Sequence, residues 1–233
     1  MSFHFSPKII YDGLVLYLDA ANPKSYPATS SIFFDLSKEL NNGSIDNSPT
    51  YTSQYGGGFT FDGVNDAINI PYTSSLSPSV GVTLFSFFNI SGFNSYYAPI
   101  IFKKNTFASN YEEYEIGIYS GGNVRAIITG VDNSQKQVIS GSNSFNKLTC
   151  AAATFDTVAN EIKLYIDGTL VGTNVTFTST FNSSTFGVNI GSVTFSSYPG
   201  YAIGTIYNSM IYNRVLSLEE INKNYESLRN RFL

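Results

Sequence analysis

Three oxygen-bearing side chains in one short loop are candidate ligands for a hard metal ion. The loop Phe61-Asp-Gly-Val-Asn-Asp66 places Asp62, Asn65 and Asp66 within one tight turn. Calcium takes about six to eight oxygen ligands, and loop carbonyls could complete such a set. The same residues also suit a plain turn between two strands, because Asp and Asn bond their own backbone there. With only two carboxylates the turn is favoured, so we expect no cofactor, with a structural calcium as the alternative.

Six tyrosines in three polar loops are candidate contacts for a glycan or for another protein. The loops cover residues 91–97, 109–114 and 195–201 and supply Tyr96, Tyr97, Tyr111, Tyr114, Tyr198 and Tyr201. Flat apolar rings stack on sugars, and neighbouring polar groups bond the sugar hydroxyls. Tyrosine is equally suited to a contact between protein subunits. The absence of tryptophan lowers the expectation of a strong sugar platform, and both interpretations stay open.

Several functional classes are disfavoured by what the chain lacks. The single histidine, His4, lies in the N-terminal segment, so a Ser-His-Asp triad is implausible. The single cysteine, Cys150, excludes an intrachain disulfide and is expected to be a buried thiol. A net charge of −4 without a basic run argues against nucleic acid as a partner. No apolar stretch approaches the roughly 18 residues of a membrane span, and no signal peptide is visible.

The elements that must position these residues are short runs rich in Ser, Thr, Tyr, Phe, Val and Ile, separated by Gly, Asn, Asp and Pro. Such runs without intervening helices predict antiparallel strands in two packed sheets. Asp167-Gly168 suits a two-residue turn between two of them. The predicted strands are residues 13–19, 32–35, 59–62, 67–70, 82–90, 99–103, 114–119, 124–130, 148–155, 161–167, 169–172, 186–191 and 202–213.

One helix is predicted, over residues 217–231. Ser217-Leu-Glu-Glu220 is a capping box, in which the serine hydroxyl and the Glu220 carboxylate each accept a backbone N–H of the other residue. An apolar stripe with helical spacing follows, made of Leu218, Ile221, Tyr225 and Leu228. No linker or internal repeat divides the chain. We therefore predict one domain over residues 12–233, preceded by an N-terminal arm of residues 1–11.

Three segments in a fixed order carry a family resemblance. The first is Gly13-Leu-Val-Leu-Tyr-Leu-Asp-Ala-Ala-Asn-Pro-Lys-Ser-Tyr-Pro27, with Phe34-Asp-Leu-Ser37 and Asn41-Asn-Gly43 after it. The second is Gly57-Gly-Phe-Thr-Phe-Asp-Gly-Val-Asn-Asp66. The third is Ile162-Lys-Leu-Tyr-Ile-Asp-Gly168, with Asn189-Ile-Gly191 and Ile211-Tyr-Asn-Arg-Val-Leu-Ser217 after it. Together they resemble the laminin-G-like (LamG), concanavalin A-like jelly-roll superfamily, and more narrowly its versions in tailed-phage structural proteins.

The resemblance covers roughly residues 11–230 and implies an all-β fold. This fold is a two-sheet antiparallel jelly-roll sandwich, here with one C-terminal α-helix. In such folds the concave face and the loops at one rim bind glycans, calcium or protein partners. Because a fold does not decide a function, each site must be argued from its own residues.

The resemblance also indicates where catalytic carboxylates would lie, since glycosidases with this general fold carry paired acids on one strand. The nearest match is Glu113-Tyr-Glu115, where strand alternation predicts both carboxylates on one face. A retaining pair needs carboxyl groups about 5–5.5 Å apart, which this spacing approaches. The third acid of the Glu-x-Asp-x-x-Glu pattern is missing, so no enzymatic activity is predicted.

The leading functional prediction is a non-enzymatic virion structural protein, exposed on the particle as a capsid decoration, fibre or tail-associated component. A domain that starts at Met1 without a secretion signal would reach the exterior by lysis of the host. The arm of residues 1–11 would contact other virion proteins, and particle symmetry favours a homo-oligomer. The alternative is a carbohydrate-binding module of a bacterial cell-surface or extracellular protein, with cell-surface polysaccharide as its partner. Neither nucleic acid nor a membrane is expected as a partner.

Overall fold

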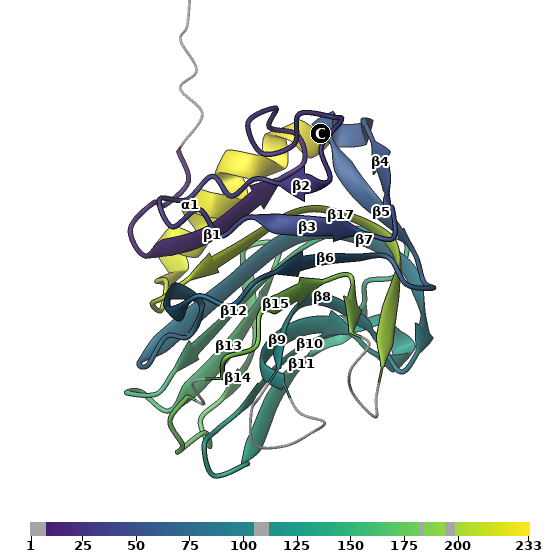
Figure 1. Ribbon diagram of the computed structural model, residues 1–233. Coiled ribbons are helices and arrows are strands. Elements are labelled where there is room, and N and C mark those ends of the chain that lie inside the picture. Colours follow the sequence, from purple (N-terminus) through teal and green to yellow (C-terminus); the bar gives the residue numbers. More distant parts are fainter. Residues whose placement is uncertain (1–7, 105–111, 182–183, 194–198) are drawn as a thin grey trace, which may run out of the picture.

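The computed structural model describes residues 8–104, 112–181, 184–193 and 199–233. Within these residues two antiparallel sheets pack face to face (Figure 1). The larger sheet has the strand order β14 (Thr169–Asn174), β13 (Glu161–Ile166), β12 (Leu148–Asp156), β7 (Gly81–Ser95), β17 (Gly200–Tyr212), β5 (Gly58–Asp62) and β4 (Thr50–Thr52). Two more strands, β1 (Leu14–Asp19) and β16 (Ser192–Val193), also pair with β17.

The smaller sheet lies against the larger one. Its strand order is β11 (Gln135–Asn143), β10 (Asn123–Thr129), β9 (Glu112–Ile118), β8 (Ala98–Lys104), β15 (Val188–Ile190), β6 (Ala67–Ile70), β3 (Gly43–Asp46) and β2 (Ile32–Phe33). Short 3₁₀ turns lie at Gln54–Gly56, Ser74–Leu76 and Ser120–Gly122. The predicted two-sheet antiparallel sandwich is therefore confirmed, and so is the Asp167-Gly168 turn, where both residues have positive φ.

The main core lies between the sheets and follows from strand alternation. In β12, Ala151, Ala153 and Phe155 face this core, whereas Cys150 and Ala152 face the opposite side of the larger sheet. Cys150 is a free, buried thiol, as predicted. Strand alternation thus gives the larger sheet two apolar faces, and the second face needs its own cover.

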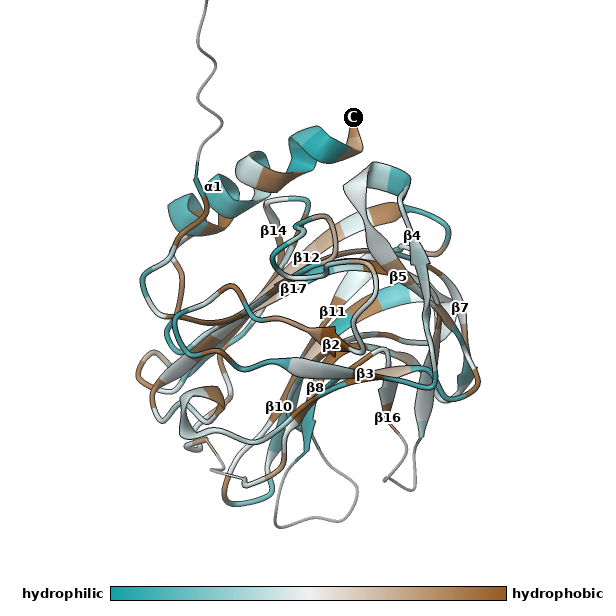
Figure 2. Cartoon of the chain, turned by 45° about the horizontal axis from the view of Figure 1, so that its top comes forward, coloured by the Kyte–Doolittle hydropathy of each residue, from teal (hydrophilic) through white to brown (hydrophobic). Residues whose placement is uncertain are grey.

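The helix α1 (Leu218–Arg229) supplies that cover. The Ser217 hydroxyl accepts the N–H of Glu220 at 3.2 Å, and the Glu220 carboxylate accepts the N–H of Ser217 at 2.9 Å, so the capping box is confirmed. Ile221 and Leu228 are buried against the second apolar face, while much of the helix surface is hydrophilic (Figure 2). A 3₁₀ turn, Asn230–Phe232, follows the helix. None of the described helices is long and apolar enough to cross a bilayer.

Both ends of the described chain are fastened on this helix side. The Ile10 N–H donates to Asn224 Oδ1 at 2.8 Å, and the Tyr212 hydroxyl donates to the Ile10 carbonyl at 2.9 Å. Arg231 pairs with Asp19 of β1 at 2.6 Å. The predicted arm of residues 1–11 is wrong for residues 8–11, because Ile9 is buried in the second core and Ile10 is hydrogen-bonded. Residues 1–7 lie outside the described part of the chain.

Candidate functional site

A row of polar side chains crosses three neighbouring strands on the outer face of the smaller sheet. Ser44 of β3 pairs with Asn69 of β6, which pairs in turn with Asn189 of β15. Asn69 lies between Ile68 and Ile70, which face the core, so strand alternation turns its side chain outward. Adjacent strands lie about 4.8 Å apart, and the row therefore spans roughly 10 Å.

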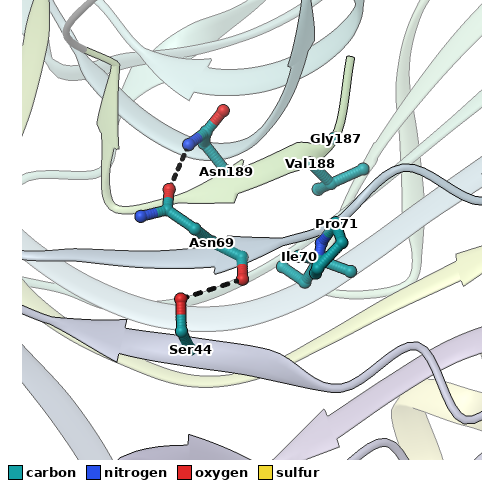
Figure 3. A pocket seen from close by; sticks show the side chains of 7 residues that line it. All are labelled: Ser44, Asn69, Ile70, Pro71, Gly187, Val188 and Asn189. Carbon is teal, nitrogen blue, oxygen red and sulfur yellow. Dashed lines mark hydrogen bonds between the residues drawn. The ribbon is translucent and has the colours of Figure 1, made fainter. Parts of the chain in front are cut away.

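This row forms part of an open pocket of about 260 Å³ (Figure 3). Its lining residues are Ser44, Asn69, Ile70, Pro71, Gly187, Val188 and Asn189. Gly187 lies so close to β6 that a Cβ atom there would stand 2.1 Å from the Ile70 carbonyl oxygen. Only glycine fits at this distance, and it lets the segment before β15 approach the end of β6 along one side of the pocket.

Hydrogen bonds orient the polar groups of the row. Asn189 Nδ2 donates to Asn69 Oδ1, and Asn69 Nδ2 donates to Asp46 Oδ2. The Ser44 hydroxyl donates to the main-chain oxygen of Asn69 at 3.4 Å (Figure 3). The side-chain nitrogens of Asn69 and Asn189 each carry two N–H groups, and the bond that each nitrogen donates uses only one of them. The row can therefore present oriented donors and acceptors to a molecule that carries several hydroxyl groups.

Two half-exposed aromatic rings come from the segments that border this pocket. Tyr72 directly follows Pro71, Phe186 directly precedes Gly187, and each ring residue is 40% exposed. The Lys104 ammonium group lies 4.6 Å from the centre of the Phe186 ring, within the range of a cation–π interaction. Aromatic rings beside amide and hydroxyl groups are the combination that can stack on a pyranose ring and bond its hydroxyls.

An apolar cluster lies at one end of the row, on β8. Asn189 pairs with Phe102 of β8, which continues the row across the sheet. Phe102 packs against Tyr97 and Val193, and these three residues are buried. At the other end Ser44 pairs with Ile32 of the edge strand β2, which is 40% exposed. A ligand lying along the row would therefore meet a wall at β8 and an open edge at β2.

Tyr97, one of the predicted contact residues, also belongs to a polar cluster next to this wall. The Tyr97 and Tyr119 rings stack with 4.7 Å between their centres, and the Arg125 guanidinium lies 3.2 Å from the centre of the Tyr119 ring. The Tyr119 hydroxyl donates to Glu115 Oε1 at 2.9 Å. Tyr97 is only 5% exposed, so its prediction as a surface contact is wrong. Its ring is buried against Tyr119, and the Arg125 guanidinium packs on the Tyr119 ring.

The prediction that the carboxylates of Glu113 and Glu115 lie on one face of β9 is also wrong. The strand register pairs Lys103 with Tyr114 and Lys104 with Glu112, so Glu113 is an extra residue in a β-bulge. The bulge breaks the alternation that would put Glu113 beside Glu115. Glu115 is instead influenced by Glu112: burial, followed by the negative charge of Glu112, raises the pKa of Glu115 well above its ordinary value. Burial likewise raises the pKa of Glu112.

Glu113 takes part in a buried ion pair. Its Oε2 lies 2.7 Å from Lys103 Nζ and accepts the N–H of Ser184 at 3.0 Å. Lys103 Nζ also donates to the carbonyl oxygen of Ser184 at 2.9 Å and to its hydroxyl at 2.5 Å. Both charged side chains are fully buried. This arrangement fastens the segment before β15 to β8 and β9, which is a structural role.

Tyr114 is the second predicted contact residue that the structure contradicts. It lies on the core side of β9, is fully buried, and donates its hydroxyl to the Leu76 carbonyl at 2.8 Å. Tyr96 is 54% exposed, and Tyr201 of β17 is partly exposed. The Tyr96 N–H donates to Pro199, which is two residues from Tyr201 in sequence. Neither of these two tyrosines is buried, so their prediction as contact residues stays a prediction, whereas Tyr111 and Tyr198 lie outside the described residues.

The candidate calcium loop is a hydrogen-bonded turn in this structure. Asp62 Oδ1 accepts the N–H of Val64 at 2.8 Å, and Asp66 Oδ2 accepts the N–H of Asp62 at 3.0 Å. Asn65 is exposed, and its carbonyl oxygen accepts from Asn47. Burial raises the pKa of Asp66. In the described part of the chain no group of three or more His, Cys, Asp or Glu residues could hold a metal.

None of the pocket residues was among the candidate contact or metal-ligating residues, although Asn189 belongs to a segment that carries the family resemblance. Asn69 and Asn189 each stand between two β-branched residues in a short strand, in Ile68-Asn-Ile70 and Val188-Asn-Ile190. A polar residue at the solvent-facing position of such a run is common, so each asparagine alone carries no signal. The signal would be their pairing across the sheet, which depends on register and not on sequence order.

Comparison with known proteins identifies one matching family model and several solved structures with a similar fold. A laminin G family model, described as the concanavalin A-like lectin/glucanases superfamily, matches residues 62–222. The binding domain of paraclostridial mosquitocidal protein 1 is similar, with a TM-score of 0.69 and 13% identity over 91% of this chain and 52% of that chain. No curated protein matches the sequence.

Two further solved structures, both of complexes, are similar. The ligand-binding domain of botulinum neurotoxin serotype D, in complex with N-acetylneuraminic acid, has a TM-score of 0.69 and 19% identity over 93% of this chain and 51% of that chain. Trypanosoma rangeli sialidase, in complex with the inhibitor DANA, has a TM-score of 0.68 and 16% identity over 95% of this chain and 35% of that chain. This chain thus spans about half, or less, of the chains it resembles, and at these identities the likeness shows the fold alone.

Proposed function

Because the chain belongs to the concanavalin A-like lectin/glucanase superfamily, we propose that it is a non-enzymatic domain that binds glycans in the pocket of Ser44, Asn69 and Asn189. The observation that carries this proposal is the oriented row of one hydroxyl and two amides on an open sheet face. Glycan recognition needs closely spaced donors and acceptors together with flat apolar surface. Tyr72 and Phe186, which are 40% exposed and adjoin the lining residues Pro71 and Gly187 in sequence, would supply that surface.

The proposal is supported by what similar folds bind. The serotype D neurotoxin domain was solved with N-acetylneuraminic acid, and the Trypanosoma rangeli sialidase with sialic acid and with the inhibitor DANA. Since the fold covers only part of each of those chains, their ligands do not indicate which sugar this pocket takes. The sugar that binds would depend on the groups around the row, which include Asp46, bonded to Asn69, and Lys104, next to the Phe186 ring.

The positions of the nearby carboxyl groups support a function without catalysis. Glu113 is neutralised by Lys103 in a fully buried pair, and Glu115 lies in the buried cluster beyond the Phe102 wall. Asp46 holds the Asn69 amide. A glycosidase needs two carboxyl groups on either side of the bond that it cleaves. None of the seven residues that line the pocket carries a carboxyl group.

We place this domain on the exterior of a virion, as a capsid decoration, fibre or tail-associated component, or on an extracellular or cell-surface protein. The chain carries few charges, and its hydroxyl- and amide-rich surface suits contact with glycans or neighbouring protein subunits. Residues 1–7 would be the segment that attaches to other virion proteins, since Ile9 and Ile10 contact the domain. Purified particles should contain the full chain by mass spectrometry and lose it when residues 2–7 are deleted. Unchanged incorporation of the deleted chain would exclude the attachment role.

The glycan proposal is tested by binding to arrayed bacterial lipopolysaccharides, capsular polysaccharides and sialylated oligosaccharides. Asn69→Ala and Asn189→Ala should each weaken binding about tenfold, equivalent to about 1.4 kcal/mol, because each removes oriented hydrogen bonds. Asn222→Ala, on the exposed surface of α1, is the matched control and should bind like the wild type. The proposal fails if the wild type binds none of these glycans, or if both pocket variants bind as it does.

A further inference from the structure

The outer face of the smaller sheet is open on one half and covered on the other. Register partners on this face form one line from β3 to β10: Ser44, Asn69, Asn189, Phe102, Glu115 and Ile127. The first three are exposed or partly exposed, whereas Phe102 is 2% exposed and Glu115 and Ile127 are fully buried. A side chain that points outward from a sheet is buried only where other residues stand over it. The line therefore passes from an open half over β3, β6 and β15 to a covered half over β8, β9 and β10.

An aromatic layer forms the border of the covered half. Phe102 packs against Tyr97 and Val193, and all three residues are buried. Gly117, on the outward side of β9, leaves room for this layer, because a Cβ atom there would stand 3.3 Å from the Tyr97 ring. Since Phe102 is the register partner of Asn189, the layer rises directly beside the open half. It forms a step at that end of the pocket.

The opposite end of the line is the edge of the sheet. Ser44 is exposed, and its partner Ile32 on the last strand, β2, is 40% exposed. The pocket between the step and this edge measures about 260 Å³. Pockets that enclose a whole ligand of drug size measure roughly 300–1,000 Å³. A pocket of this smaller size would hold only the first units of a glycan, and the open edge gives the remainder of the chain a way out.

We propose that the pocket takes the non-reducing end of a glycan chain, with the rest of the chain leaving across β2. This inference rests on the glycan-binding function proposed above. A chain bound through an internal stretch along the row would have to leave the pocket at both ends, and the step at β8 blocks one of them. The reducing end of a cell-surface polysaccharide is joined to its carrier, so the free end is the non-reducing one.

The chemistry of the row beside the step fits a terminal sugar. A terminal unit carries a hydroxyl group that an internal unit uses for its next glycosidic bond. The side-chain nitrogen of Asn189, next to the step, has a second N–H beyond the one that it donates to Asn69. This N–H is a donor for the additional hydroxyl. An internal unit has no hydroxyl at that position, so the step and the donor favour the same occupant.

The test counts the protein molecules that bind to one glycan chain. The probes are the linear capsular polysaccharides and lipopolysaccharide O-chains that the wild type binds on the array, each cut into fragments of defined length. Every fragment is titrated into the full chain by calorimetry. One protein molecule should bind each fragment at every length, with the same Kd per chain, because each linear chain has one non-reducing end.

A pair of variants tests the path across β2. Ile32→Glu places a charged side chain on this path and should weaken the binding of long fragments about tenfold. It should leave the binding of the methyl glycoside of the terminal sugar unchanged. Ile139→Glu is the matched control, because Ile139 is 47% exposed on β11, the edge strand at the other end of the same sheet. This control should bind both probes like the wild type. Thermal unfolding should show that both variants are folded, since both positions are exposed.

Two results would overturn the inference while leaving glycan binding in place. One is a number of bound protein molecules that rises with fragment length, which indicates binding to internal stretches. The other is Ile32→Glu that binds long fragments as tightly as the wild type does. A wild type that binds no glycan at all is a different result, because it refutes the proposed function and this inference together.

Discussion

Replacing Lys103 with methionine should remove a large part of the stability of the domain. Lys103 Nζ makes three polar contacts, at 2.7 Å to Glu113 Oε2 and at 2.9 and 2.5 Å to the carbonyl and hydroxyl oxygens of Ser184. Methionine keeps the apolar stem but removes the charge and all three donors. Breaking a fully buried pair costs about 3–5 kcal/mol, because the remaining charge is left without its partner. In a chain of this size that loss lowers Tm by about 6–20 °C.

The assay is urea and thermal unfolding of the wild type and Lys103→Met at neutral pH. Lys163→Met is the matched control, because Lys163 pairs with Glu161 and both side chains are about one-third exposed. An exposed pair contributes at most about 1 kcal/mol. The double variant Lys103→Met/Glu113→Leu removes both charges and should recover most of the loss. The reasoning is refuted if Lys103→Met costs less than about 1 kcal/mol, or if the double variant is no more stable than the single one.

Three further predictions concern pH and calcium. Arg214 beside Glu220 holds the pKa of that carboxyl at about 2 against an ordinary 4.5, so the pair stabilises the fold above pH 4.5 and this contribution is lost as the pH falls toward 2. Thermal unfolding of Glu220→Gln should lack this part of the acid transition, and an unchanged acid profile would contradict it. Burial raises the pKa of Glu115 in the folded state, so stability should fall as the pH rises above the ordinary glutamate value. Urea unfolding of Glu115→Gln should show a flatter pH dependence and greater stability than the wild type at pH 8; equal stability at that pH would refute this. Because Asp62 and Asp66 already accept loop N–H groups, we expect the same Tm in calcium and in chelator, and a higher Tm in calcium would establish the metal site.

The fold could be predicted from the sequence where local patterns carry the information. The strand Ala67–Ile70 agrees with its prediction residue for residue, and the capping box at Ser217 marks the start of α1. β11 was missed because Gln135–Asn143 is mostly polar and borders solvent on one side, so its alternation is weak. It is held in place by pairing with β10, a tertiary contact.

The site was less predictable because it depends on register and burial. A bulge at Glu113 changes which carboxylate neighbours Glu115, and no local pattern in Glu112-Glu-Tyr-Glu115 indicates it. Tyr114 was expected at the surface but is buried, because the Leu76 carbonyl satisfies its hydroxyl. Asn69 and Asn189 are 120 residues apart in sequence and meet only through the order of strands in the smaller sheet.

Both ends of the described chain are attached beside α1, on one side of the domain. Ile10 is bonded to Asn224 of the helix, and Arg231 pairs with Asp19, all beside the outer face of the larger sheet. The Asn69–Asn189 pocket opens on the outer face of the smaller sheet, on the opposite side of the sandwich. A carrier joined through either end therefore leaves the pocket facing away from it. Many copies fixed in this way on one support would all turn their pockets outward, so that the glycan binding proposed for each pocket would act multivalently.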